Sequence, residues 1–255
     1  RESAKMMRHV DPTAELSAAA LSDPSWNLNL LKLCGENLDW ISIHEYWDMM
    51  PEKNEPANYE QCMAFTHCID HSVHEVRGML AALKLDGRIK IAFDEWNLRG
   101  WHHPNFIDTW SRERYRNEDK EFYEKNIIGA RDCNDINATY TMADAVFSAA
   151  FLNACLRNCD IVGMACFSPV VNTRGAICTH KDGIVLRPQY FVFELYANLL
   201  KDTVLQQWQQ DVPTLSGTDF DKPVTVDAVD LVVTVDDAGY AIAAVNKDPE
   251  AAQTV

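Results

Sequence analysis

Hydrophobic and polar positions follow two patterns in the larger, N-terminal part of the chain. Runs with a period of two predict strands, and longer stretches with helical spacing predict helices. We expect strands at 15–20, 39–46, 89–93 and 161–167, and helices at 25–34, 59–85, 137–159 and 188–200. Four strand–helix units in series predict an α/β fold, namely the second half of a (β/α)8 TIM barrel, strands 5 to 8, over residues 1–202.

The pattern changes near Val204, where the apolar segments become short and alternate strictly with polar residues. Residues 230–235 and 240–245 are typical of two strands joined by a turn at 236–239. They predict a partial C-terminal β-sandwich over residues 203–255. The first residues resemble the end of a helix already under way and the last ones the start of a strand, so we expect a fragment of a longer protein.

Composition narrows the classes of partner. The formal net charge of -15 argues against nucleic acid and against an anionic membrane surface, because both would repel the chain, whereas a neutral sugar is compatible with it. No apolar run reaches the roughly 18 residues of a membrane-spanning helix. The 8 cysteines are too sparse for a secreted disulfide scaffold, so we expect reduced thiols and a cytoplasmic location.

The segment KIAFDEWN at 90–97 carries the strongest chemical signal. It runs from an apolar strand directly into Glu95, and barrel enzymes carry their chemistry at the carboxyl ends of strands. On the preceding strand His44 and Tyr46 share one face, where the tyrosine hydroxyl can donate to Glu95 and favour its ionised form. Alternation lets only one of Asp94 and Glu95 face the mouth of the barrel, so they are not expected to act as a pair. The alternative is that His44 and Tyr46 are satisfied core residues.

Several segments carry a resemblance to a known family: ISIHEYW at 41–47, IAFDEWN at 91–97, MACFSPVVNTRG at 164–175 and GIVLRPQYFVFELYAN at 183–198. In them the chain resembles the C-terminal half of an α-L-arabinofuranosidase of glycoside hydrolase family 51. The resemblance implies a retaining hydrolase that removes terminal α-L-arabinofuranosyl groups from plant oligo- or polysaccharides. It implies Glu95 as the nucleophile at the end of strand seven, His44 and Tyr46 as substrate-binding residues on strand six, and no metal or cofactor.

The retaining mechanism needs a second carboxyl about 5 to 5.5 Å from the nucleophile. In the family it is a glutamate in an Asn-Glu pair at the end of strand four, which this chain does not include, so we expect the fragment alone to be inactive. We also expect the four parallel strands to fold poorly on their own, because they leave an open sheet edge. The resemblance implies a homo-oligomer for the full-length protein.

The chain departs from the family pattern at two places. Arg99 occupies a position where relatives often carry tryptophan, and Trp101 follows two residues later. Trp101 either stacks on sugar or packs its loop. The strand-eight region at 165–168 lacks the glutamine that some relatives offer to the sugar. Asn172 and Arg174 follow in the next loop, where they either line the pocket or brace the loop.

Other readings remain open. His67, His71 and His74 share one helix face with a spacing that zinc could use, although a solvated or partly packed face is the preferred interpretation. An endo-glucanase or a xyloglucan-active relative fits the same catalytic strand. A non-catalytic carbohydrate-binding remnant fits the same fold.

Overall fold

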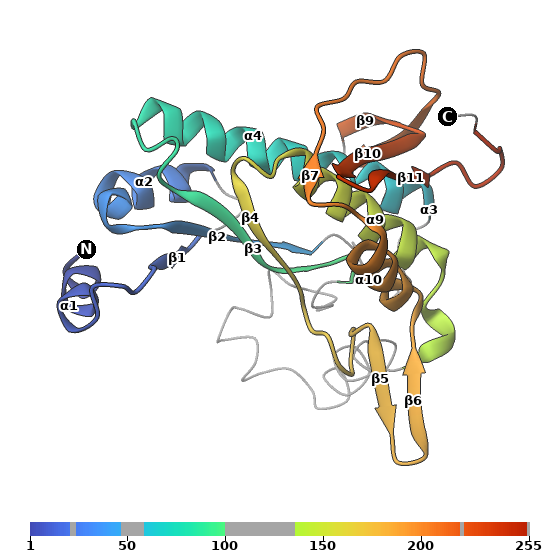
Figure 1. The fold of residues 1–255 in the computed structure, drawn as a ribbon, viewed down its shortest axis with the longest axis horizontal. Helices are drawn as coiled ribbons and strands as arrows, with labels where there is room; N and C mark the ends of the chain where they lie inside the picture. Colours follow the sequence, from blue (N-terminus) through green and yellow to red (C-terminus); the bar gives the residue numbers. More distant parts are fainter. Residues whose placement is uncertain (21–23, 47–58, 100–135, 220–221, 254–255) are drawn as a thin grey trace, which may run out of the picture.

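The computed structural model describes residues 1–20, 24–46, 59–99, 136–219 and 222–253 (Figure 1). The first part of the chain alternates strands and helices, in the order α1 (Glu2–Val10), β1 (Ser17–Ala19), α2 (Pro24–Cys34), β2 (Trp40–Tyr46), α3 (Tyr59–Ala64), α4 (His67–Ala82), β3 (Lys90–Asn97), α9 (Met142–Arg157) and β4 (Val162–Phe167). The second part begins with a hairpin and a helix, β5 (Ile177–His180), β6 (Gly183–Leu186) and α10 (Pro188–Leu199). It continues with β7 (Thr203–Val204), β8 (Thr214–Asp219), β9 (Lys222–Asp227), β10 (Val229–Asp236) and β11 (Gly239–Asn246).

Strands β1 to β4 form one sheet in sequence order, and each neighbouring pair is parallel. Consecutive parallel strands joined by helices are the repeating unit of a (β/α) barrel. Because all four strands run the same way, their carboxyl ends meet at one edge of the sheet. This edge holds the ends of β2 and β3, where the sequence places the candidate chemistry.

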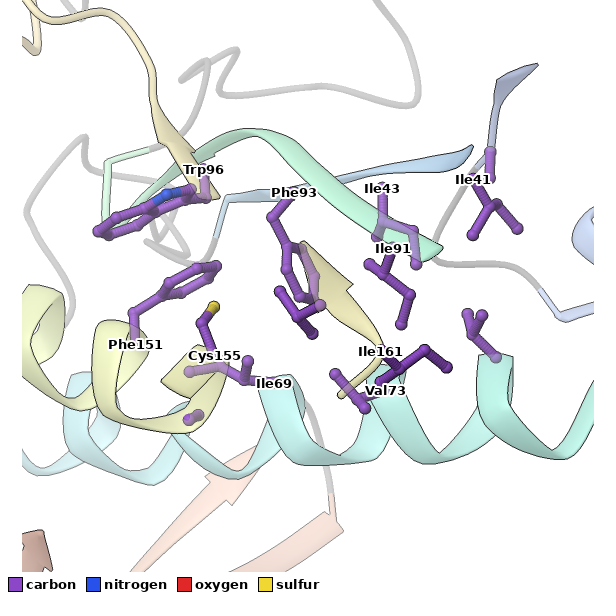
Figure 2. Close-up of a cluster of buried hydrophobic side chains, with 14 of the residues drawn as sticks. Ile41, Ile43, Ile69, Val73, Ile91, Phe93, Trp96, Phe151, Cys155 and Ile161 are labelled. Carbon is purple, nitrogen blue, oxygen red and sulfur yellow. The ribbon is translucent and has the colours of Figure 1, made fainter. Parts of the chain in front are cut away.

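The main hydrophobic core lies between this sheet and helices α4 and α9 (Figure 2). Ile91 and Phe93 of β3 are fully buried there, as are Ile69 and Val73 of α4. Phe93 meets Phe151 of α9 edge-on, with ring centroids 5.3 Å apart. Each side chain of this size contributes about 1.5–3 kcal/mol on burial, so this layer anchors β3 firmly.

Helix α9 is apolar around most of its surface because it is covered on several sides. It contacts α4 and β4 on the barrel side, and α10, β10 and β11 on the other. Its first turn has a capping box: the Thr141 side chain accepts from the Ala143 backbone, and the Asp144 side chain accepts from the Thr141 backbone at 2.9 Å. Such reciprocal caps satisfy backbone donors that a helix start leaves open.

The last strands form antiparallel sheets, β7 with β10 and β11, and β8 with β9. Strand β10 pairs with β11 through a tight turn at 236–239, as the sequence predicts. The β5–β6 hairpin projects away from the barrel sheet (Figure 1). Among the described residues, no helix combines the length and the apolar character needed to cross a membrane.

The observed elements differ from the sequence prediction in several places. The helix predicted at 59–85 is divided at Phe65 and Thr66 into α3 and α4. The strand predicted at 15–20 shrinks to three residues. The helix predicted from 137 opens with a short 3-10 turn before α9 begins at Met142. In the first case both segments are apolar on the same side, so the periodicity continues across the break and conceals it.

Candidate active site

Glu95 lies near the carboxyl end of β3 with its side chain 42% exposed. The Tyr46 hydroxyl donates to Glu95 Oε2 at 2.7 Å, and His44 Nδ1 lies 3.5 Å from the same oxygen. Within the described part of the chain, Glu95 Oε1 has no hydrogen-bond partner. One carboxylate oxygen is therefore held by β2 while the other stays available. The hydrogen bond expected between Tyr46 and Glu95 is present.

Tyr46 is held at its hydroxyl by Glu95 and over its ring by Arg174. Its ring lies under the guanidinium of Arg174, whose Cζ is 4.9 Å from the ring centroid. Burial raises the pKa of Tyr46, and the hydrogen bond to Glu95 raises it further. The hydroxyl therefore keeps its proton through the neutral range and remains a donor to the carboxylate.

Asp94 corrects one expectation from alternation. Its Oδ1 lies 3.3 Å from His44 Nε2, so the imidazole stands between the carboxylates of Asp94 and Glu95. The expectation that only one of these carboxylates reaches this side is wrong. Both carboxylates reach the His44 ring because the register of β3 shifts between Phe93 and Trp96, which interrupts the period of two.

Ser42 is a site residue that the sequence reasoning missed. Its hydroxyl donates to Asp94 Oδ1 at 2.8 Å, and the residue is only 4% exposed. Ser42, His44 and Tyr46 follow one another at a spacing of two, so the same-face argument that selected His44 and Tyr46 could have found it.

The residues after Glu95 tie the strand end to its surroundings. The Asn97 side chain donates to the carbonyls of Ser168 and Arg174, both at 3.1 Å. Arg99, at the position that departs from the family pattern, makes a buried two-point ion pair with Asp144 of α9, at 2.7 and 3.1 Å. Arg99 therefore braces the end of the strand against the start of α9. No pattern in the sequence signals this pair, because its members are 45 positions apart.

The other predicted site residues have different surroundings. Asn172 is exposed in the loop before β5, where its Oδ1 accepts from the Thr179 backbone and hydroxyl, both at 2.8 Å. Arg174 is 5% exposed and donates to the Arg99 carbonyl at 3.1 Å. Asn172 thus braces its loop, and Arg174 both braces the loop and contacts Tyr46. Trp101 lies outside the described residues.

The three histidines of α4 make separate contacts. His67 Nδ1 and His74 Nδ1 each lie within hydrogen-bond distance of a backbone carbonyl one helical turn earlier. His71 is paired with Glu75 at 3.3 Å. Among the described residues, no group of three or more His, Cys, Asp or Glu side chains is arranged to hold a metal ion.

Comparison with known proteins identifies the family. Residues 94–253 match the model of the α-L-arabinofuranosidase C-terminal domain. The chain belongs to the α-L-arabinofuranosidase C-terminal domain family. It is 27% identical over 263 aligned residues to an intracellular exo-α-(1→5)-L-arabinofuranosidase of Bacillus subtilis, covering 99% of this chain and 48% of that protein. It is 28% identical to an exo-α-(1→6)-L-arabinofuranosidase of Bifidobacterium longum, covering 96% of this chain and 46% of that protein.

Solved structures of family 51 share the fold. The family 51 α-L-arabinofuranosidase of Bifidobacterium longum superimposes with a TM-score of 0.75 at 24% identity, over 97% of this chain and 49% of that one. The Thermotoga maritima α-L-arabinofuranosidase, solved as an arabinose complex, gives 0.70 at 24% identity, over 94% and 45%. The predicted fold class, the second half of a (β/α)8 barrel followed by part of a β-sandwich, is confirmed. The chain spans about half the length of the family 51 relatives it matches.

Proposed function

We propose that the native protein containing this chain is a retaining α-L-arabinofuranosidase, with Glu95 as its nucleophile. The observation that carries the proposal is the hydrogen bond from Tyr46 to Glu95 at the carboxyl edge of the parallel sheet, in a chain of this family. Barrel enzymes place reacting groups at this edge. The similarity to an exo-α-(1→5)- and an exo-α-(1→6)-L-arabinofuranosidase favours exo action on terminal arabinofuranosyl groups.

The two oxygens of the Glu95 carboxylate have different contacts, and we assign them different roles. Tyr46 and His44 hold Oε2, so Oε1 is the oxygen that attacks the anomeric carbon. The bond from that carbon to the leaving oxygen breaks, and a covalent arabinosyl-enzyme forms. A second carboxyl first protonates the leaving oxygen and then removes a proton from the incoming water. We place that carboxyl on the barrel strands that the relatives have and this chain does not include.

The substrate contacts follow from the same arrangement. His44 is 41% exposed beside Glu95, which supports its role as a hydrogen-bond partner of a sugar hydroxyl. Tyr46 supports the nucleophile, and Arg174 supports Tyr46. Trp101 and Asn172 remain proposed sugar contacts. For Asn172 the proposal has less support, since its side-chain oxygen already accepts two hydrogen bonds from Thr179 of β5.

The decisive experiment uses the native protein that contains this chain and 4-nitrophenyl α-L-arabinofuranoside. Wild-type protein should release 4-nitrophenol, and Glu95→Ala should lower kcat by about 10⁴-fold or more, because removal of a covalent nucleophile has effects of this order. An intact-mass measurement should find one arabinosyl unit on wild-type protein and none on the variant. Undiminished turnover by Glu95→Ala would reject the nucleophile assignment.

The remaining alternatives are outcomes of the same assay. Cleavage of xyloglucan or of internal glucan bonds, without release of arabinose, would favour the endo-acting reading. Sugar binding with no turnover would favour the carbohydrate-binding remnant. We further propose an intracellular location, because two similar bacterial enzymes are intracellular exo-α-(1→5)-L-arabinofuranosidases. We also propose a homo-oligomer, which light scattering of the native protein can test.

A further inference from the structure

Strand β3 contains one residue more than either of its neighbours at the candidate site. Against β2, Ala92 pairs with Ser42 and Glu95 pairs with His44, so three steps on β3 match two on β2. Against β4, Phe93 pairs with Ala165 and Trp96 with Phe167, again three steps against two. The one residue that lies strictly inside both intervals is Asp94. Asp94 is therefore the extra residue of a β-bulge, a feature that is frequent beside active sites.

The bulge reverses the side on which Glu95 emerges. Ile91, Phe93 and Trp96 all lie on the side of the sheet that faces α4 and α9 (Figure 2), and all three are fully buried. Strict alternation would place Glu95 on that same buried side, because it is two residues beyond Phe93. With one extra residue, Trp96 takes the buried position instead and stacks on Phe151 at 3.9 Å. Glu95 then emerges beside His44 and Tyr46.

Two contacts hold the bulge in place, and both involve Asp94 Oδ1. The buried Ser42 hydroxyl donates to this oxygen at 2.8 Å, which links the bulge to β2. His44 Nε2 lies 3.3 Å from the same atom, while the other ring nitrogen faces Glu95 Oε2 at 3.5 Å. Asp94 Oδ1 thus contacts both β2, through Ser42, and the imidazole ring that lies beside Glu95.

We infer that Asp94 is a positioning residue for the nucleophile: its carboxylate, anchored by Ser42, holds the bulge and the His44 ring so that Glu95 Oε1 points at the substrate. The inference rests on the proposed function of Glu95. It assigns no proton transfer to Asp94, because Asp94 acts through the backbone and through His44. A displaced nucleophile loses rate even when substrate binding is intact, since reaction depends steeply on the distance and angle of approach.

The test compares Asp94→Ala, Asp94→Asn and Ser42→Ala in the native protein that contains this chain. Asp94→Ala removes both contacts and should lower kcat by about 10²-fold with little change in KM. Asp94→Asn keeps an oxygen that can accept from Ser42 but loses the charge beside His44, so its loss should be smaller, about 10-fold. Asp86→Asn, an exposed aspartate before Gly87, is the matched control and should behave as wild type.

A double-mutant cycle tests whether Ser42 and Asp94 act through one contact. If they do, Ser42→Ala combined with Asp94→Ala should lose no more rate than Asp94→Ala alone. Losses that multiply would overturn the anchoring role of Ser42. The midpoint of urea unfolding is measured for every variant. Because Asp94→Asn retains the anchor, it keeps the inference testable if Asp94→Ala fails to fold.

A series of leaving groups separates positioning from acid catalysis. A displaced nucleophile slows 4-nitrophenyl, phenyl and disaccharide substrates by the same factor, whereas loss of a general acid slows the most basic leaving group the most. Equal factors are expected for Asp94→Asn. A loss that grows with leaving-group basicity, an arabinosyl adduct mapped to Asp94, or a kcat equal to that of Asp86→Asn would overturn this inference alone. An inactive wild type, or an active Glu95→Ala, would overturn the proposed function as well.

Discussion

Residues 90–93 and 94–97 are the two halves of β3, and they differ in the direction of their side chains. In the first half Ile91 and Phe93 alternate regularly into the core and are fully buried. In the second half the register shifts, and Asp94 and Glu95 both reach the His44 ring. The apolar half therefore determines where the strand lies, and the irregular half determines which groups it presents. Changes at Ile91 and Phe93 should affect folding, and changes at Asp94 and Glu95 should affect chemistry.

The largest stability effect is expected at the contact between the end of β3 and α9. Asp144→Ala removes the carboxylate from the buried Arg99 pair, whose side chains are 6% and 3% exposed, and also breaks the capping box. Breaking a buried pair from one side costs about 3–5 kcal/mol. Urea unfolding of the native protein should report this loss. Asp182→Ala, which removes a 74% exposed carboxylate, is the control and should change little. A loss of less than about 1 kcal/mol, the range of exposed pairs, would show that the pair does not brace the strand.

The regular half of β3 should contribute to stability alone. Ile91→Ala leaves a cavity in the core between the sheet and α4, and such truncations cost about 2–5 kcal/mol. Ile184→Ala is the matched control, because Ile184 is 64% exposed on the hairpin. The folded fraction of Ile91→Ala should keep the wild-type kcat. If kcat falls while the midpoint of unfolding stays unchanged, the division between the two halves is wrong.

The groups that contact Asp94 and Glu95 should contribute mainly to rate. Tyr46→Phe removes only the hydroxyl that donates to Glu95, and hydrogen bonds to charged groups are worth about 1.5–3 kcal/mol. We expect kcat/KM to fall by about 10- to 100-fold. Tyr240→Phe, with a 73% exposed ring on β11, is the control. Since burial and then Glu95 raise the pKa of Tyr46 above 10.0, wild-type activity should not lose this donor at any pH below 10.0. An unchanged rate for Tyr46→Phe would remove Tyr46 from the site.

The smallest effect is expected at the opposite, amino edge of the sheet. Burial opposes ionisation of Asp39, but the Leu16 backbone donor at 2.7 Å and Arg8 outweigh it and lower its pKa below 3.8. The folded form therefore binds a proton less readily than the unfolded chain, so Asp39 stabilises the fold above pH 3.8 and loses this effect as the pH falls through its folded pKa. Asp39→Asn should cost about 0.2–1 kcal/mol at neutral pH.

The pH dependence supplies the check on this last prediction. Thermal unfolding of wild type and Asp39→Asn should differ at pH 6 and converge below pH 3.8. If the difference in stability between wild type and Asp39→Asn grew as the pH falls, the pKa of Asp39 would not be lowered in the folded protein. Because Asp39 lies at the other end of the strands from Glu95, kcat should not change in this variant.

The local elements could largely be predicted from the sequence because they depend on neighbouring residues. The strands at 39–46, 89–93 and 161–167 appear as β2, β3 and β4, with β3 extended by four residues to Asn97. The shared face of His44 and Tyr46 follows from a period of two, whereas their approach to Glu95 depends on the bulge in β3. The predicted boundary between barrel and sandwich, at 202 and 203, stays a prediction, as do the catalytic roles of the site residues.

The sequence by itself determined the order of strands and helices, the position of a carboxylate at a strand end and the family, because these depend on residue type and local spacing. Only the tertiary structure decided on which side that carboxylate emerges. The bulge at Asp94 exists in relation to the registers of β2 and β4, and the Arg99–Asp144 pair joins residues that meet only after α9 packs on the sheet. Glu95 could be selected from the sequence, because its place at a strand end depends on residue type and local spacing. The direction of its side chain depends on the register of β3 against β2 and β4, about which local spacing carries no information.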